Sequence, residues 1–388
     1  MNFDYNDEQR QFADALGRFV AKDYGFEARK AIVASASGAS DSVWQTLAEL
    51  GVLALPLAGE HGGFDGGAVD LMPVMEAFGD ALLVEPYLST LGLAAQCIAR
   101  SGSAAQQAAI LPLVASGEMK LAFAHAERAA RYRPQSVAMR AVRSATGWIL
   151  DGEKCMVLHG PLANRVVVSA RTAGAAGERD GISLFLVDPA APGVTHKPYR
   201  TVDEMPAADM LFSQLALDDD ALLGVAGGAL PVIEDVLDFA TALVCAEAVG
   251  AIAYANAQTL EYLKTRRQYR TTIGSFQALQ HRMVEMMISH EQARSMACLV
   301  CVKVDTETDP VARSRIVSAA KIRIAQACRL VAAESVQMHG GIGMTDELKL
   351  SHTFRRLMVI ARQFGDMDHH LARFAQLDRS LMDRAIAL

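Results

Sequence analysis

The stretch that decides the fold runs from Phe239 to Arg270 and reads FATALVCAEAVGAIAYANAQTLEYLKTRRQYR. Between Ala240 and Ala257 it contains a single charged residue, Glu247, and no proline. A helix that is apolar on every face is normally buried on nearly all sides. The sequence therefore predicts a long buried helix with one carboxylate inside it.

Glu247 admits two interpretations. An ionised carboxylate in apolar surroundings costs several kcal/mol unless it is paired or coordinated. One interpretation is a general base, because catalytic carboxylates often occupy such surroundings. The other is a buried ion pair in which an arginine from a neighbouring helix satisfies the carboxylate. The helix alone leaves both interpretations open.

The C-terminal end of the same helix carries a basic cluster, formed by Lys264, Arg266, Arg267 and Arg270. At about 1.5 Å per residue, Arg266 lies about 28 Å along the helix from Glu247. One small site cannot use both ends. Either the ligand is long or the two ends serve different sites, as happens when the subunits of an oligomer share pockets across symmetric interfaces.

Composition excludes several classes of function. The chain has 388 residues, 51% of them apolar and 21% charged, which suits two or three globular domains with large cores. The net charge of -7, with no basic tract beyond Lys264 to Arg270, argues against a nucleic acid or an anionic membrane as partner and favours a small-molecule ligand.

The remaining compositional signals concern location and metals. The chain has no run of 18 uncharged apolar residues, and its first residues, MNFDYNDEQRQF, are polar and acidic. We therefore expect neither a transmembrane span nor a secretory signal, and a cytoplasmic protein. The six cysteines show no paired CxxC metal spacing, since Cys298 and Cys301 lie one helical turn apart but lack His or further Cys partners. We therefore expect free thiols and no metal site.

The hydrophobic periodicity changes twice along the chain. It is helical from Asp7 to about Val114, changes to short β-rich runs separated by turn signals from Leu121 to about Leu223, and becomes helical again after a glycine-rich hinge. Trp44 to Pro56 predicts a helix stopped by Gly51 and then a short apolar strand. The C-terminal helices are expected at 230–267, 276–305, 310–338 and 346–362, followed by a last segment, 368–388.

These changes predict a mainly α protein of three domains. An N-terminal helical domain would cover 1–118, a middle β domain in the form of a small antiparallel barrel or sandwich 119–228, and a C-terminal four-helix bundle 229–388. Between two bundle helices lies the sequence Gln337-Met-His-Gly-Gly-Ile-Gly343. Gly340 and Gly341 suit a plain helix stop, and they also let backbone N–H groups approach an anion closely.

This domain order, at this length, resembles the acyl-CoA dehydrogenase family of flavoproteins over essentially the whole chain. The most specific motif is Arg266-Arg-Gln-Tyr-Arg-Thr-Thr-Ile273 with Phe276, Gln277 and His281, which is similar to the family's R-x-Q-F-G-x-x-I-x-x-F-Q-x-x-x-H. The second is Gln337 to Gly343, similar to the family's Q-x-x-G-G-x-G. Weaker support comes from Trp44 to Gly63 and from Gly152-Glu-Lys154.

The resemblance implies FAD as cofactor, with its adenosine diphosphate part bound by these two motifs of a neighbouring subunit. That arrangement agrees with a helix whose two ends serve different sites. A guanidinium group offers a bidentate fork to a pyrophosphate. The residues implied are Arg266, Gln268, Tyr269, Phe276, Gln277, Gln337, His339, Gly340 and Gly341.

The chain departs from the family where the flavin ring would lie. The family's T-E-P-x-A-G-S-D loop is replaced by Ala126-Glu-Arg-Ala-Ala-Arg-Tyr-Arg133, and W-I-T-N-G is replaced by Met156-Val-Leu-His-Gly160. The glycine of R-x-Q-F-G is Arg270. The remaining positions that the resemblance places at the cofactor are Phe123, Ala126, Met156, Leu158, Gly365 and Asp366.

Neither of the family's usual bases is present. The catalytic glutamate of the Y-E-G-T turn falls on Phe364, in Gln363-Phe-Gly-Asp366, and the alternative base of some members falls near Ala240. Glu247 lies two helical turns beyond Ala240, on nearly the same face, and is our candidate for the missing base. Asp366 and Asp368 are weaker candidates. The backbone N–H at Phe364 can still polarise a thioester carbonyl, because a backbone donor survives side-chain replacement.

The activity implied by the resemblance is FAD-dependent α,β-dehydrogenation of an acyl-CoA thioester. A carboxylate removes the α proton while a hydride leaves Cβ for flavin N5. The loss of both usual bases also resembles the smaller subunits of heteromeric enzymes of pimeloyl-CoA and steroid side-chain degradation. The chain is therefore an active dehydrogenase with Glu247 as base, a subunit completing a partner's FAD site, or a non-enzymatic scaffold on the same fold.

The resemblance also implies partners. We expect a homo- or hetero-oligomer, either a tetramer or a dimer of dimers built on the C-terminal bundle, with reoxidation by an electron-transferring flavoprotein.

Overall fold

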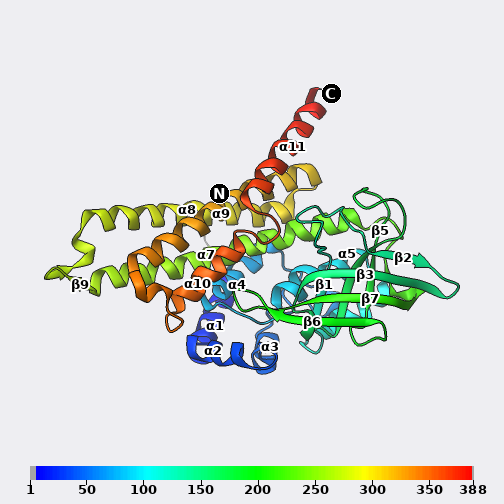
Figure 1. The fold of residues 1–388 in the computed structure, drawn as a ribbon, viewed down its shortest axis with the longest axis horizontal. Helices are drawn as coiled ribbons and strands as arrows, with labels where there is room; N and C mark the ends of the chain where they lie inside the picture. The colour runs from blue at the N-terminus through cyan, green and yellow to red at the C-terminus, as the bar shows by residue number, and fades with distance from the viewer. Residues whose placement is uncertain (1–5, 387–388) are drawn as a thin grey trace. The chain divides into compact units, whose positions relative to one another are not determined.

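Long helices follow the middle domain, where the periodicity places them. The computed structural model describes residues 6–386. The ends of the predicted first and last domains therefore lie outside the described residues, as does the start of the N-terminal segment for which no secretory signal is expected. The C-terminal helices are α7 (Leu230–Thr265), α8 (Gln277–Thr306), α9 (Pro310–His339), α10 (Lys349–Ile360) and α11 (Met367–Ile386). Figure 1 shows α7, α8 and α9 running beside one another. The predicted helical C-terminal part is confirmed, and its helix ends agree within a few residues.

The buried character of α7 follows from its small side chains. Residues 242–252 of this helix are almost all fully buried. A Cβ atom built on Gly250 would overlap the backbone oxygen of Glu76, and one built on Gly79 would overlap the backbone oxygen of Glu247. Helix α4 (Ala68–Ala81) therefore lies almost in backbone contact with α7. By length and composition α7 can cross a membrane, but 89% of its most apolar window is buried inside the protein.

The N-terminal part is helical, as predicted. It contains α1 (Asp7–Asp23), α2 (Phe26–Ala34), α3 (Asp41–Glu49), α4, the π-helical segment η2 (Leu88–Ala94), α5 (Ala95–Ser101) and α6 (Ala104–Ala115). The prediction of a strand after Gly51 is wrong. Residues 52–56 form consecutive turns, with Leu55 N–H donating to Gly51 O at 3.1 Å. Turns bury this apolar run without a neighbouring strand to pair with it.

The middle of the chain forms one mostly antiparallel sheet. Its strands are β1 (Leu121–Ala124), β2 (Arg140–Arg143), β3 (Gly147–Leu158), β4 (Arg165–Arg171), β5 (Ile182–Val187), β6 (Val194–Arg200), β7 (Pro206–Asp218) and β8 (Leu222–Leu223). The order is β6-β7-β3-β2-β4-β5-β8, and β1 pairs with β4 in parallel. Its core contains Trp148 and Phe185, with ring centroids 5.4 Å apart. The predicted middle β domain is confirmed.

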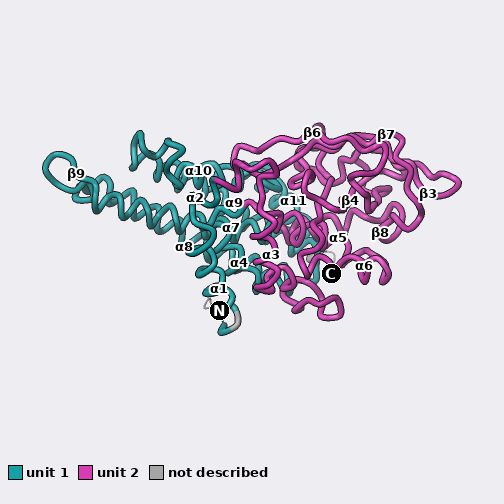
Figure 2. The backbone as a smooth tube through the Cα atoms, turned by 90° about the horizontal axis from the view of Figure 1, so that it is seen from below, with its two compact units in different colours: residues 1–30, 67–83, 241–388 teal, residues 31–66, 84–240 magenta. Residues whose placement is uncertain are grey.

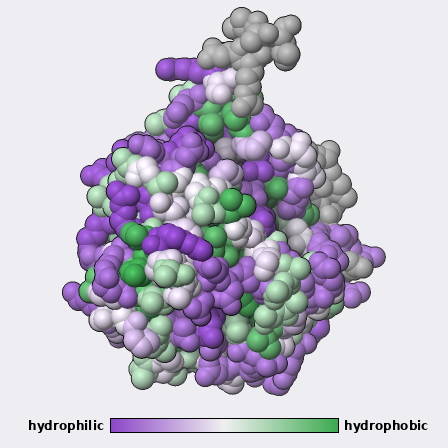
Figure 3. All heavy atoms as spheres, turned by 90° about the vertical axis from the view of Figure 1, so that its right-hand side faces the viewer, coloured by the Kyte–Doolittle hydropathy of each residue, from purple (hydrophilic) through white to green (hydrophobic). Residues whose placement is uncertain are grey.

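Contacts along the chain define two units that differ from the predicted domains (Figure 2). The first consists of residues 1–30, 67–83 and 241–388, so α1 and α4 belong with the C-terminal helices. The second consists of residues 31–66 and 84–240. The boundaries predicted at 118 and 228 stay a prediction. The face drawn in Figure 3 mixes hydrophilic and hydrophobic residues without a broad apolar area.

Candidate functional site

Glu247 forms a buried ion pair with Arg356 of α10. The guanidinium donates from Nε to Oε1 and from Nη2 to Oε2, both at 2.6 Å. The two residues are 5% and 6% exposed. This geometry is the ion-pair interpretation of Glu247, since both carboxylate oxygens accept charge-assisted hydrogen bonds. The role of Glu247 as base stays a prediction.

Arg356 was missed in the sequence, although a signal for it exists. Thr353, Leu357 and Ile360 mark the buried face of α10, and the helical spacing puts Arg356 on that same face. A charged residue on a buried helix face requires a partner of opposite charge. Glu247, alone in its apolar helix, requires one as well. Two buried charges of opposite sign, on helices of one bundle, were the available clue.

The first cofactor motif forms the end of a helical hairpin. After α7, Arg267–Gln268 pairs with Thr271–Thr272 as the short strands β9 and β10, and η5 (Ile273–Ser275) leads into α8. Arg266 is exposed, Tyr269 is 87% exposed, and the Tyr269 ring meets the Phe276 ring edge-on at 6.1 Å. Gln268 and Gln277 are also exposed. The motif therefore points its side chains away from this chain's own core.

The departure at Arg270 has a conformational consequence. Tyr269 and Arg270 have φ values of 50° and 65°, in the left-handed region that glycine adopts most easily. The hairpin turn keeps the geometry that suits the family's glycine even though the residue is an arginine. The substitution adds a third exposed guanidinium beside Arg266 and Arg267.

The second motif lies at the end of α9, beside the first. The rings of Tyr262 in α7 and His339 in α9 stack with centroids 4.4 Å apart. His339 is buried, its Nδ1 lies 2.8 Å from Ser335 O, and burial lowers its pKa. Its role at the cofactor stays a prediction. Gly340 has a φ of 66°, and a Cβ atom built on Gly340 or Gly341 would meet nothing within 4 Å. Gln337 is exposed.

The two motifs together fit the adenosine diphosphate part of FAD. Exposed guanidinium groups and an open, side-chain-free glycine pair are the features that bind a diphosphate. Because the side chains of Arg266, Gln268 and Gln277 are exposed, a second chain can cover them.

In the middle domain, the loop after β1 is tied to β3. Ala126 O accepts a hydrogen bond from Cys155 N at 2.9 Å. The Glu127 carboxylate accepts bonds from Ala138 N and Met139 N and from Lys154 Nζ at 2.7 Å. Lys154 is fully buried, and burial lowers its pKa to about 8. Glu127 and Lys154 thus hold Ala126 beside the irregular part of β3.

That irregular part of β3 contains Met156. The register of β3 against β7 shifts between Lys154 and Val157, and Met156 has a φ of 51° and is 57% exposed. Its N–H donates to Asp209 at 3.1 Å. Leu158 ends the strand and is half-buried. The bulge turns Met156 outward, where a ligand can reach it.

Next to Phe123 lie His125 and, in contact with His125, Ser169, two residues that the sequence did not suggest. The Phe123 ring stacks on the His125 ring, with centroids 5.4 Å apart and an interplanar angle of 3°. His125 Nδ1 lies 2.9 Å from Ser169 Oγ. Burial and the neighbouring Lys154 lower the pKa of His125 to about 3, so the imidazole is neutral at ordinary pH.

Phe364 lies in a tight turn between α10 and α11. Phe364 and Gly365 have φ values of 60° and 134°. The N–H of Gln363 donates to Val359 O and that of Gly365 to Arg362 O. Among the backbone groups and side chains that the structure describes, the Phe364 N–H has no hydrogen-bond acceptor. A free donor between two engaged ones is what a carbonyl-polarising site requires.

Asp366 has a structural partner. Its Oδ1 accepts a hydrogen bond from His369 N at 2.9 Å, which caps the first turn of α11. Asp368, on the first turn of that helix, is exposed.

Comparison with known proteins gives a consistent result over the chain. Family models described as acyl-CoA dehydrogenase, N-terminal domain, middle domain and C-terminal domain match residues 6–118, 122–219 and 228–376. Acyl-CoA dehydrogenase FadE12 of Mycobacterium tuberculosis is 28% identical, with 100% of this chain and 96% of that protein aligned. The L-prolyl-[peptidyl-carrier protein] dehydrogenase of Pseudomonas fluorescens is 27% identical, over 96% and 98%.

Solved structures agree with these sequence matches. The Tcur3481-Tcur3483 steroid acyl-CoA dehydrogenase is 26% identical with a TM-score of 0.86, covering 97% of this chain and 99% of that one. An acyl-CoA dehydrogenase from Geobacillus kaustophilus is 25% identical with a TM-score of 0.87, covering 96% and 98%.

Proposed function

The chain belongs to the acyl-CoA dehydrogenase family, and on that premise we propose that it dehydrogenates the α,β bond of an acyl-CoA thioester with FAD as its cofactor. The observation that carries this proposal is the match of all three family domains in order, over nearly all of residues 6–376. FAD, when bound, supplies the acceptor for a hydride from Cβ. The protein must bind, orient and desolvate the thioester, and must remove a proton from Cα.

The hairpin and glycine motifs are our proposed site for the adenosine diphosphate part of a neighbouring subunit's FAD. Arg266 is placed to bind the pyrophosphate, and the open space at Gly340 and Gly341 lets backbone N–H groups approach it. Tyr269 and Phe276 offer aromatic surface for the adenosine. In the middle domain, Phe123, Ala126, Met156 and Leu158 are the proposed lining for the flavin ring.

Two groups of the C-terminal unit take part in the proposed chemistry. The free N–H of Phe364 donates to the thioester carbonyl, which acidifies the α proton by stabilising the developing enolate. Glu247 is the proposed base. Its paired state requires that Arg356 release one carboxylate oxygen before that oxygen accepts a proton.

The ion pair favours a second candidate function, a subunit that completes the FAD site of a partner chain. Glu247 is already satisfied, and the position of the family's glutamate is occupied by Phe364. In this alternative the carboxylate comes from the partner. The steroid enzyme at 26% identity carries a double designation, in agreement with an assembly of unlike chains. For either function we propose an oligomer, a cytoplasmic location and an electron-transferring flavoprotein as electron acceptor.

Purification separates these functions. The chain expressed alone is examined for flavin absorbance, for mass by light scattering and for anaerobic bleaching by an acyl-CoA. A yellow homo-oligomer that bleaches supports the first function. A colourless chain that turns yellow only with a co-expressed partner supports the second. A colourless protein under every condition would contradict both and leave a scaffold.

A further inference from the structure

A buried lysine lies beneath the turn that carries Phe364. Lys321 of α9 is fully buried, and its Nζ donates to Ile360 O at 2.8 Å and to Gly365 O at 3.0 Å. Among the residues whose side chains the structure describes, Lys321 forms no ion pair, and the Asp366 carboxylate acts on it only from a longer distance. Burial lowers the pKa of Lys321. Burying an amine that forms no ion pair is unfavourable. The two carbonyl acceptors offset part of this cost.

The two carbonyls bracket the turn. Ile360 is the last residue of α10, where helix carbonyls lack partners within the helix and carry the negative end of the dipole. Gly365 follows Phe364. A Cβ atom built on Gly365 would lie 2.5 Å from Nε2 of His370, so the His370 ring closes the same side of the turn. Lys321 and His370 thus fix the inner side of the segment 361–365.

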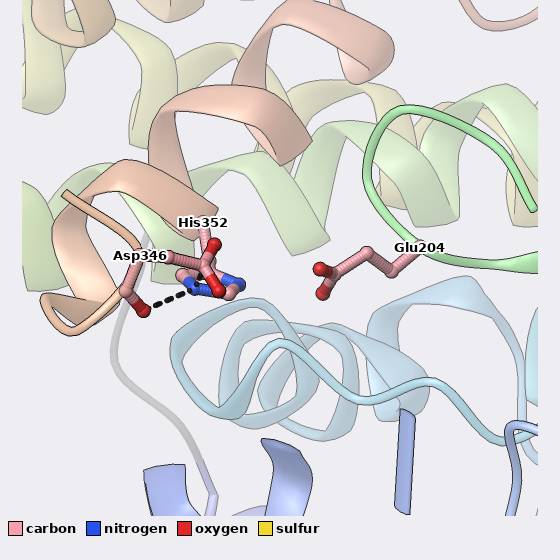
Figure 4. A group of neighbouring side chains, drawn as sticks. All are labelled: Glu204, Asp346 and His352. Carbon is pink, nitrogen blue, oxygen red and sulfur yellow. Dashed lines mark hydrogen bonds and ion pairs between the residues drawn. The ribbon is translucent and has the colours of Figure 1, made fainter. Parts of the chain in front are cut away.

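The other end of α10 is held independently. His352 is buried, its Nε2 lies 3.0 Å from Asp346 O, and Arg355 Nη2 lies 2.9 Å from Asp346 Oδ1. Figure 4 shows Asp346 and His352 side by side at this end of the helix. Changes at Lys321 therefore act on the turn and leave the start of α10 in place.

The same turn carries the free N–H of Phe364. With its neighbours Gln363 and Gly365 engaged by Val359 O and Arg362 O, its direction is set by the turn. Phe364 holds the left-handed conformation, which costs a non-glycine residue of order 1 kcal/mol or more, so the turn needs an external restraint.

We propose that Lys321 is a positioning residue, which holds the carbonyls of Ile360 and Gly365 inward and so presents the Phe364 N–H to the thioester carbonyl. The inference rests on the proposed function. It goes beyond that function by assigning the orientation of the carbonyl-polarising group to a lysine that touches neither substrate nor cofactor. A lysine that merely stabilises the fold would affect melting and leave the polarisation of a bound thioester unchanged.

The test uses the flavin-loaded protein and the variants Lys321→Met and Lys321→Gln. Lys321→Gln keeps an uncharged N–H donor group and serves if Lys321→Met does not fold. Lys349→Met is the matched control, because Lys349 is a partly buried lysine at the opposite end of α10, 3.6 Å from Asp80. Hydrogen exchange is measured over residues 359–366. The absorbance red shift of bound cinnamoyl-CoA is measured in parallel, because it reports how strongly the thioester carbonyl is polarised.

Lys321→Met is expected to raise exchange in this segment at least about tenfold and to remove most of the red shift, with Lys321→Gln in between and Lys349→Met unchanged. Unchanged exchange would show that Lys321 does not hold the turn, whatever the ligand result. Faster exchange with a normal red shift would reduce Lys321 to a structural residue. A wild-type protein that binds cinnamoyl-CoA without any shift would overturn the proposed use of the Phe364 N–H, and the exchange data would distinguish that failure from failure of the clamp.

Discussion

At the scale of single residues, the pairing of Glu247 with Arg356 bears on whether Glu247 can act as the base. Glu247→Gln keeps the shape of the side chain but cannot form two charge-assisted bonds to Arg356. We expect the free energy of unfolding to fall by about 3 to 5 kcal/mol, the usual result of breaking a buried ion pair by removing one of its charges. Thermal melting measures this loss. Glu261→Gln, which breaks an exposed pair with Lys264 on the same helix, is the control and should change little.

The same variant tests the base. If Glu247 removes the α proton, anaerobic single-turnover reduction by an acyl-CoA falls by several orders of magnitude in the variant that is still folded. A variant that melts early and reduces its flavin at the normal rate eliminates Glu247 as base. That outcome favours the function in which the carboxylate comes from a partner chain.

Arg266 carries the cofactor assignment. Arg266→Ala should weaken FAD retention by roughly tenfold or more, because a charge-assisted bond to a phosphate is lost, while melting of the flavin-free protein stays unchanged. Equilibrium dialysis of FAD measures the first effect. Lys264→Ala, two residues earlier and paired with Glu261, is the matched control. Flavin retention equal to that of the wild type would show that the motif is not used as proposed.

The sequence predicted the positions of these residues better than their partners. Arg266, Gly340 and Phe364 lie at the helix end, the helix stop and the turn where the sequence placed them. Lys321 was missed because it looks like an ordinary helical cation until the neighbouring helix is known, and Arg356 was missed although its place on a buried helix face was a signal. Periodicity assigns a residue to a face, but the opposite partner comes from the packing of separate elements.

At the scale of elements, α4 and α7 cross with their backbones close together. Gly250→Ala places a methyl group on the backbone oxygen of Glu76, so the helices must move apart. We expect the free energy of unfolding to fall by about 2 kcal/mol or more, as for overpacked cores. Gly17→Ala in α1, where a Cβ atom meets nothing within 4 Å, should instead stabilise by about 1 kcal/mol. Urea unfolding compares the two; equal effects would contradict the close crossing.

The elements themselves were largely predictable. Capping residues and prolines mark several ends, such as Asp309 and Pro310 at the start of α9, whose cap bonds Val311 N. The strand expected after Gly51 failed because a short apolar run has no periodicity that distinguishes a strand from buried turns. The grouping of α1 and α4 with the C-terminal helices was also outside what local pattern can show, since it depends on contacts far apart in sequence.

At the scale of the whole molecule, buried thiols make the free energy of unfolding depend on pH in the alkaline range. Burial raises the pKa of Cys97, Cys245 and Cys328 to about 12, from an ordinary value of 9.0. Between pH 9 and 12 the unfolded chain therefore releases protons that the folded protein keeps, and the free energy of unfolding falls as the pH rises. Urea unfolding in reductant at several pH values should show a shallower fall in the triple alanine variant. An identical fall would contradict this origin.

The exposed face of α8 is where we expect chains to associate. Val284, Met287 and Ile288 are each about half exposed at helical spacing, close in sequence to Phe276. Replacing Val284 and Ile288 by aspartate should lower the mass measured by light scattering and release flavin together. Val225→Asp, at a residue 79% exposed, is the control and should leave both unchanged. A variant of unchanged mass would place the interface elsewhere.

The open glycine pair at the end of α9 has a consequence for how the protein behaves in dilute solution. A binding surface that one chain exposes and a second chain completes makes cofactor affinity a property of the concentration of the protein itself. Dilution below the dissociation constant of the assembly should release the flavin without unfolding either chain. By the same linkage, added FAD should promote association of separated chains, so the cofactor stabilises the assembly as well as taking part in the reaction.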